Sequence, residues 1–220
     1  MKKKFAILGI LLGTGLASAV FAAMPAGASI SADGRMTFTA PGAQRSKASP
    51  GVRGDAIHLK EIYSTFSSDE ANLYDCCIAY NLTTAKSLAQ ARQTLAIPFT
   101  TARPGLVSKV QLGLSYFAGT NAISISLRAD DGGLPGKALH TFVVSDIPPG
   151  GSCCEVMVAG PKVMLVKGST TYWIVAQAKG DTYGGWNLNT ANMDGPFAIN
   201  VGNGWQSTTG TLGALRVLGE

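Results

Sequence analysis

The chain has few of the side chains on which most enzymes depend. Its 220 residues include only two histidines, His58 and His140, and charged residues make up 14% of the sequence. A Ser-His-Asp arrangement would have to use His140, yet no nucleophile-elbow motif surrounds any serine. The H-E-x-x-H, P-loop and G-x-G-x-x-G motifs are also missing. The sequence therefore predicts a protein that is not an enzyme, and a hydrolase without a visible motif is the least favoured alternative.

Positive charge is scarcer than the net value suggests. The chain has 18 Lys and Arg against 13 Asp and Glu, a net charge of +5, but three of the lysines are Lys2 to Lys4. Without these three the net charge is +2, and no basic stripe is visible in the remaining sequence. Nucleic-acid binding depends on such a stripe. We therefore expect no nucleic-acid partner.

Long apolar runs are confined to the first 22 residues. Lys2 to Lys4 form a basic region, Phe5 to Leu16 an apolar run, and Ala17 to Ala23 a small-residue stretch. This order is typical of a secretory signal peptide, whereas a membrane anchor needs roughly 20 apolar residues. We assign residues 1–22 to a signal peptide and expect a secreted or periplasmic protein. No later run suggests a membrane span after cleavage or a C-terminal anchor.

The remaining sequence lacks helical periodicity. It shows neither heptads nor alternating strand and helix patterns, but it contains many of the chain's 27 glycines. Short runs with β preference, bounded by turn residues, fill residues 61–220 and predict an all-β, antiparallel β-sandwich. Residues 23–60 are rich in Ala, Gly, Ser and Pro and predict a flexible tail, in which only Arg35 to Thr39 has the alternation of a short strand.

The stretch from Lys109 to Gly136 is the clearest strand pattern. Apolar residues alternate with small polar ones from Val110 to Tyr116 and again from Ile123 to Leu127, on either side of a Gly-Thr-Asn break. The short break predicts one antiparallel hairpin with a single buried face. Thr170 to Ala178 has β formers on both faces and predicts a central, doubly covered strand. Pro98 predicts an edge or bulge for the strand that contains it.

The order of these runs resembles the secreted bacterial β-sandwich domains described as "choice-of-anchor" domains, many of which carry a C-terminal sorting anchor of the PEP-CTERM kind. The resemblance covers roughly Ile62 to Gly219. Its most specific parts are the turn Asp131 to Gly136 and the strand around Tyr172-Trp173. It implies a jelly-roll-like sandwich and no shared catalytic activity. The chain departs from the anchored members because Glu220 directly follows the last strand.

The four cysteines occur as two adjacent pairs, Cys76-Cys77 and Cys153-Cys154. In an exported chain they predict disulfides, for which three pairings exist. Neighbouring side chains on a strand point to opposite faces, so two parallel bridges would be strained and we favour at least one bridge between the pairs. Bridges within each pair remain an alternative. A four-thiolate metal site is disfavoured because the spacing is not C-x₂-C.

The turn at Asp130 and Asp131 is a candidate calcium site. Carboxylates are hard oxygen ligands, and binding modules of the jelly-roll type often hold a structural Ca²⁺. No complete D-x-D-x-D-G run is present, so a solvated turn is the favoured alternative. Apart from this Ca²⁺ we expect no cofactor.

Trp186 and Trp205 lie in Gly-rich stretches near Tyr183 and Asn187. Aromatic rings beside amides suit the apolar face and hydroxyls of a sugar, so these four residues form a candidate ligand site. The favoured alternative is that both tryptophans fill the ends of the core.

Together these patterns predict a non-catalytic exported β-sandwich that acts by contact at the cell envelope or in the extracellular matrix. Its expected partner is a glycan or an envelope protein. The alternative is a structural, self-assembling surface protein without a small ligand. The oligomeric state is not predicted.

Overall fold

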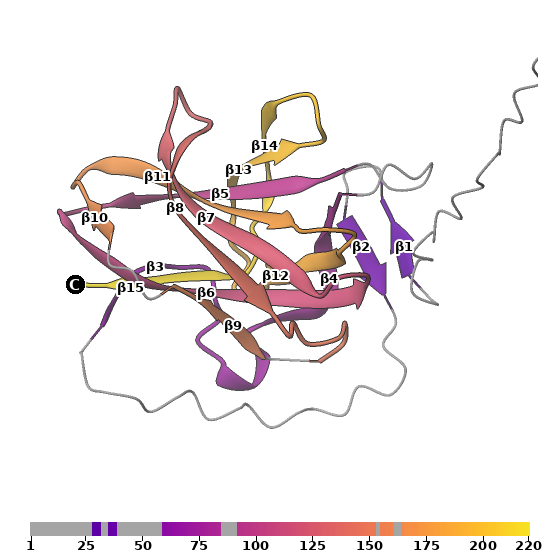
Figure 1. Cartoon of the computed structure of the whole chain (residues 1–220). Coiled ribbons are helices and arrows are strands. Elements are labelled where there is room, and N and C mark those ends of the chain that lie inside the picture. The colour runs from indigo at the N-terminus through magenta and orange to yellow at the C-terminus, as the bar shows by residue number, and fades with distance from the viewer. Residues whose placement is uncertain (1–27, 32–34, 39–58, 85–91, 153–154, 161–163) are drawn as a thin grey trace, which may run out of the picture.

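Two antiparallel sheets pack face to face and form a β-sandwich, as predicted (Figure 1). The computed structural model describes residues 28–31, 35–38, 59–84, 92–152, 155–160 and 164–220. In Figure 1 a six-stranded sheet forms the upper layer and a nine-stranded sheet the lower layer. No helix of the described chain is long and apolar enough to cross a membrane. The proposed signal peptide, residues 1–22, lies outside the described residues.

The nine-stranded sheet has the order β1-β2-β4-β12-β6-β15-β3, and β9 and β10 also pair with β6. Its strands are β1 (Ala28–Ile30), β2 (Arg35–Phe38), β3 (Lys60–Ser64), β4 (Tyr74–Thr83), β6 (Gly105–Ala118), β9 (Val156–Ala159), β10 (Met164–Val166), β12 (Tyr183–Asn189) and β15 (Leu215–Gly219). A short 3-10 helix, η1 (Glu70–Asn72), precedes β4 and is capped by the Asp69 side chain.

The six-stranded sheet has the order β14-β13-β5-β11-β7-β8. Its strands are β5 (Thr94–Thr101), β7 (Ala122–Asp130), β8 (Pro135–Ser145), β11 (Thr170–Ala178), β13 (Asp194–Asn200) and β14 (Trp205–Thr211). The predicted central strand is β11, which pairs with β5 on one side and β7 on the other.

The predicted hairpin between residues 109 and 128 is wrong. Both strands exist, as β6 and β7, but β6 belongs to the nine-stranded sheet and β7 to the six-stranded sheet. The Gly-Thr-Asn break is a corner between the layers. Gly119 has φ +85°, and Asp181 Oδ1 accepts hydrogen bonds from the Thr120 amide (2.7 Å) and hydroxyl (2.6 Å). Alternation specifies which face of a strand is buried, but it does not specify the strand with which it pairs.

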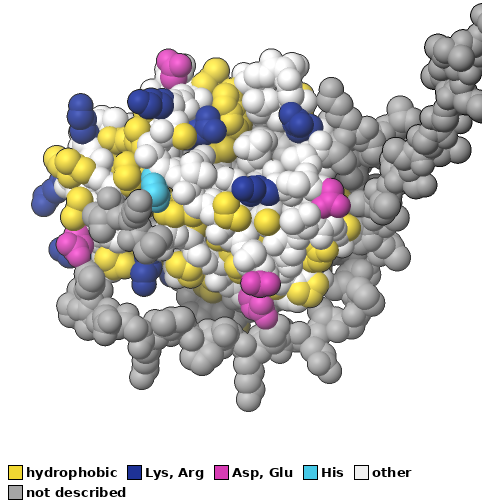
Figure 2. Space-filling view, in the orientation of Figure 1, with side chains coloured by type: hydrophobic (Ala, Val, Ile, Leu, Met, Phe, Trp, Pro, Cys, Tyr) yellow, Lys and Arg dark blue, Asp and Glu magenta, His cyan; other side chains and the backbone are white. Residues whose placement is uncertain are grey.

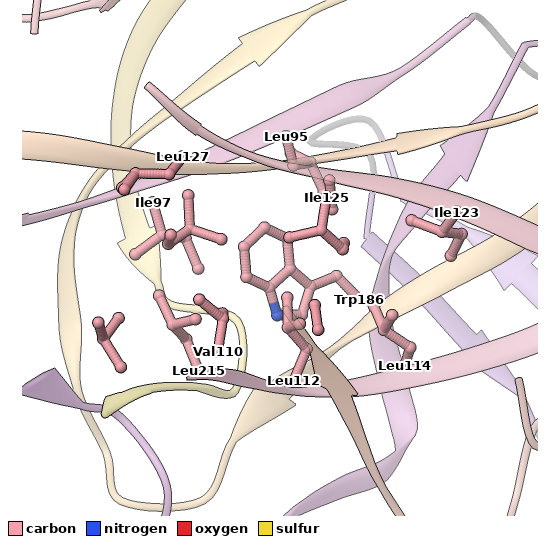
Figure 3. Packing of buried hydrophobic residues seen from close by; sticks show 14 of the residues in the cluster. Leu95, Ile97, Val110, Leu112, Leu114, Ile123, Ile125, Leu127, Trp186 and Leu215 are labelled. Atoms are coloured by element: carbon pink, nitrogen blue, oxygen red, sulfur yellow. The ribbon is translucent and has the colours of Figure 1, made fainter. Parts of the chain in front are cut away.

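The main core lies between the two sheets (Figure 3). Leu112 and Leu114 of β6 and Ile123 and Ile125 of β7 face one another across it, each at most 2% exposed. Fully burying a side chain of this size stabilises a fold by roughly 1.5–3 kcal/mol. The apolar rows that predicted a hairpin are therefore the two opposing walls of the sandwich.

Part of the predicted N-terminal tail forms strands, and residues 23–27, 32–34 and 39–58 of that tail lie outside the described residues. The short strand expected near residues 35–39 is confirmed as β2, which pairs with β4 and with β1. Met36 is fully buried beside Ala79 and Tyr183. The prediction of a flexible tail over residues 23–60 is thus wrong for β1 and β2, because Met36 supplies the apolar contact that composition alone does not reveal.

Pro98 lies where its missing N–H costs least. It opposes Trp173 of β11, whereas the pairing of β5 with β13 covers only Thr94 to Ala96. Strand β5 therefore has neighbours on both sides at its Thr94 end and on one side only around Pro98. Pro98 lies in this edge part of the strand, as predicted.

Candidate functional site

Trp186 is part of the core and not of a ligand site. Its side chain is 1% exposed, and its Nε1 donates to the carbonyl oxygen of Ala214 at 2.9 Å. Gly213 leaves room for the indole, since a Cβ there would lie 2.8 Å from the ring. Figure 3 shows the indole between the leucines and isoleucines of both sheets. The alternative that Trp186 fills the core is confirmed.

Tyr183 and Asn187 are buried as well. The Tyr183 hydroxyl lies 2.9 Å from the sulfur of Met36, and burial raises the pKa of Tyr183 to about 12. Asn187 is fully buried: its Oδ1 accepts from the Ser115 hydroxyl (2.7 Å), and its Nδ2 donates to the carbonyl oxygen of Asp75 (2.8 Å). The predicted sugar-binding set is therefore wrong for three of its four members, because strand β12 is covered on both faces.

Trp205 is the exception among the predicted ligand residues. It begins β14, in the other sheet, and is partly exposed while packing against a small cluster on that sheet's outer face. The cluster consists of Ala96, Trp173, Val175 and Ala198. Trp186 and Trp205 occur in similar Gly-rich sequence. Only the pairing of their strands determines that Trp186 is buried and Trp205 is partly exposed.

Asp130 supports the β7–β8 turn. Its Oδ1 accepts from Trp173 Nε1 at 2.7 Å, and its Oδ2 accepts from the Gly133 amide at 3.1 Å. Asp131 and Leu134 exchange backbone hydrogen bonds of 2.9 and 3.3 Å. Within the described ranges no three His, Cys, Asp or Glu side chains gather as a metal site. The arrangement is that of a self-supporting turn, and Ca²⁺ binding at Asp130 and Asp131 stays a prediction.

The first cysteine pair does not form a bridge within itself. The sulfurs of Cys76 and Cys77 are 3.8 Å apart, whereas a disulfide bond measures about 2.05 Å. Cys77 is a partly buried free thiol, so its predicted bridge is wrong in this structure. Cys153 and Cys154 lie outside the described residues, so a bridge between the two pairs remains a prediction.

His140 lies on the edge strand β8, partly buried. Its ring packs edge-on against Phe142, with centroids 4.4 Å apart. A small cavity nearby, at the side of the sandwich, is lined mainly by apolar residues that include Phe142, Leu127 and Met164. The histidine therefore occupies an apolar rim.

The outer face of the nine-stranded sheet is covered by its own chain. The aromatic ring of Tyr74 lies over Gly113, where a Cβ would come within 2.9 Å of it, and packs with Phe66 and Ala214. Met36, Ala79 and Tyr183 form a second buried cluster on this face. The described part of this face is thus occupied by internal packing.

The outer face of the six-stranded sheet carries side chains of a different kind. Exposed or half-buried Gln177, Ser124 and Asn200 lie in register across neighbouring strands, with Trp205 at the end. In Figure 1 the β7–β8 and β13–β14 turns rise on this upper side of the molecule. This outer face is the candidate functional site, and recognising it requires the pairing of all six strands.

Comparison of the chain with family models, with curated proteins and with solved structures finds no match. The functional argument therefore depends on the sequence and on the described residues.

Proposed function

We propose that this chain is an exported β-sandwich that acts by contact, without catalysis, at the cell envelope or in the extracellular matrix, and that its partner is a glycan or an envelope protein. The observation that carries the proposal is the contrast between the two outer faces. One is filled by the protein's own aromatic and amide side chains, as at Tyr74 and Asn187. The other also holds the buried cluster around Trp173, but beside it Gln177 is exposed and Ser124 and Asn200 are partly exposed.

The proposed export is supported by the order of basic, apolar and small residues within residues 1–22. The resemblance to choice-of-anchor domains also favours an exported surface role. The test is co-sedimentation of the purified mature protein with envelope preparations, alongside a broad glycoside and ester substrate panel. We expect saturable binding and no turnover. Turnover of any substrate, or no binding to any preparation, would overturn the proposal.

An oxidised bridge from Cys76 to Cys153 or Cys154 belongs to the same proposal. Cys76, unlike Cys77, is not a free thiol. The Tyr74 hydroxyl also donates to the carbonyl oxygens of Ser152 (3.3 Å) and Glu155 (2.8 Å), the residues that flank the second pair. A bridge that closes the loop from Cys76 to Cys153 or Cys154 contributes about 4 kcal/mol to the free energy of unfolding in the chain-entropy model.

The matched variants for the bridge are Cys76→Ser and Cys77→Ser. We expect the first to lower the free energy of unfolding by about 4 kcal/mol in denaturant titrations, and the second to change it by less than about 1 kcal/mol. Equal effects of the two variants, or four reactive thiols in the untreated mature protein, would contradict the bridge.

Self-assembly is a second candidate function, favoured by an apolar edge. Strand β8 ends the six-stranded sheet, and Leu139 and Val143 on it are 36% and 53% exposed. Leu165 of β10 is 73% exposed. Exposed edge strands with apolar side chains tend to pair with other chains. Sedimentation velocity over a concentration series decides: oligomers that Leu165→Lys or Val143→Lys disperses would support self-assembly, and a single monomeric species would exclude it.

A further inference from the structure

One row of side chains crosses the whole outer face of the six-stranded sheet. Each of its six members comes from a different strand, and each is paired with the next: Trp205, Asn200, Thr94, Gln177, Ser124 and Val143. Directly paired residues of antiparallel strands share a face, so all six point to the same side. Five strand spacings of about 4.8 Å make the row roughly 24 Å long.

The polar members of this row are not used to stabilise the fold. The side chains of Thr94, Gln177 and Ser124 make no hydrogen bond to any described residue, and Gln177 is exposed. Asn200 uses only its Oδ1, which accepts from the Gly202 amide at 2.7 Å. On the other sheet, by contrast, the polar side chains of Ser115 and Asn187 pair with each other. Thr94 is only 7% exposed, so the side chains that the row offers to a ligand are those of Asn200, Gln177 and Ser124.

Trp205 supplies an apolar platform at one end of the row. It packs against the cluster that contains Ala96 and Ala198, which are fully buried, while its own side chain stays partly exposed. Hydrophobic side chains are visible between the two upper turns in Figure 2. A ring supported by small residues below it loses little freedom when a second apolar surface stacks on it.

The row itself is uncharged, and two of the four nearest charged side chains are engaged within the fold. Arg128 donates to the Ser126 hydroxyl and to the carbonyl oxygen of Gly136, both at 3.2 Å. Asp130 accepts from Trp173 and Gly133. The other two, Arg92 beside Gly202 of the β13–β14 turn and Lys179 just after β11, are exposed and make no hydrogen bond or ion pair with a described residue. In Figure 2 the charged side chains lie apart from one another. Because the six members carry no charge, they match a neutral ligand that is rich in hydroxyl groups and apolar on one face.

We propose that an extended neutral polysaccharide lies along this row, across the strands. One of its sugar rings stacks on Trp205, and hydroxyl groups of this and the following sugars form hydrogen bonds with Asn200, Gln177 and Ser124. This proposal rests on the proposed contact function and specifies the class of ligand that the protein would bind. The length and straightness of the row favour a chain of several sugars over a single sugar.

The test is affinity electrophoresis of the oxidised mature protein in gels that contain a soluble neutral glucan, a soluble mannan, alginate or heparin. We expect a neutral polymer to retard the wild type. Trp205→Ala and Gln177→Ala should each weaken the interaction about tenfold or more, and Trp205→Phe should weaken it less. Gln206→Ala is the matched control, because Gln206 is an exposed amide on the same strand that points to the other side.

The outcomes separate this site from the proposed function. Retardation by the charged polymers alone, or neutral binding that survives both Trp205→Ala and Gln177→Ala, overturns the polysaccharide row but leaves contact at the envelope standing. Loss of self-association in Gln177→Ala, without any polymer bound, overturns it in favour of a second copy on this face. No retardation by any polymer overturns it too, and envelope co-sedimentation then judges the contact function independently. Thermal unfolding of each variant shows whether a loss of binding reflects loss of the fold.

Discussion

Trp173, Trp186 and Trp205 occupy three different environments. Trp186 lies between the sheets, Trp173 lies beneath the β7–β8 turn with its Nε1 bonded to Asp130, and Trp205 is partly exposed. Each indole N–H that is buried has a partner, as burial of this group requires. The same residue type thus fills the core, supports a turn and offers a surface, and the surrounding backbone decides which.

Asn187 illustrates how a buried amide binds the sheet together. It joins β6 through Ser115 and the start of β4 through Asp75. We predict that Asn187→Ala lowers the free energy of unfolding by roughly 2–3 kcal/mol, because two buried polar groups lose their partner. Urea titration measures this, with exposed Asn203→Ala as the control, which should change stability by less than about 0.5 kcal/mol. A loss for Asn187→Ala as small as that of the control would contradict this role.

Tyr183 predicts a dependence on high pH. Burial raises its pKa to about 12, above the unfolded value of about 10. Below pH 10 the phenol is neutral in both states and its stabilisation is complete. Between about pH 10 and pH 12 only the unfolded chain loses the proton, so stability falls.

Tyr183→Phe removes this titration while keeping the ring. We expect urea titrations at pH 8 and pH 11 to show a smaller loss for the variant than for the wild type. The comparison is needed because burial also raises the pKa of Tyr63, which titrates in both proteins. Parallel losses in the two proteins would show that Tyr183 ionises freely in the folded state.

At the scale of the elements, turns are easier to predict from the sequence than the strand with which each strand pairs. The turn predicted at Asp131 to Gly136 and the doubly covered β11 followed from local composition. Both are present, although β8 already begins at Pro135. The hairpin of residues 109–128 did not form, because the same alternation fits strands that face each other across a core. Strand β2 was foreseen from alternation, but its docking depends on Met36 and on β4, far away in sequence.

The candidate site was less predictable than the fold. Composition identified Trp205 but grouped it with residues of β12, which are buried. The row that includes Gln177 and Ser124 depends on five strand pairings, and a shift of one residue in any of them would turn its side chain to the other face. No local signal in the sequence encodes that register.

The β7–β8 turn gives a prediction about calcium. Both carboxylate oxygens of Asp130 already accept hydrogen bonds, so the favoured alternative, a turn without metal, predicts that neither Ca²⁺ nor EDTA shifts the thermal midpoint of the wild type. Asp130→Ala should lower the free energy of unfolding by about 1–2 kcal/mol, and Asp131→Ala by less, because Asp131 acts through its backbone. A rise of the midpoint with Ca²⁺ that Asp130→Ala abolishes would establish the metal site instead.

On the scale of the whole molecule, the two outer faces of the sandwich differ in what covers them. The nine-stranded sheet closes its outer face with Tyr74, Phe66 and Met36, which adds packed surface to the main core. The six-stranded sheet leaves Gln177 exposed and Ser124, Asn200 and Trp205 partly exposed on its outer face. A rigid sheet of this kind holds ligand-binding side chains in fixed positions, so that binding orders few side chains.

The most direct measurement is hydroxyl-radical footprinting of the mature protein with and without bound envelope material, read by mass spectrometry. If the outer face of the six-stranded sheet makes the contact, oxidation of Trp205 falls several-fold on binding. Trp186, 1% exposed, should stay weakly oxidised in both states. Unchanged oxidation of Trp205, with protection confined to Leu139 of β8 and Leu165 of β10, would contradict the account.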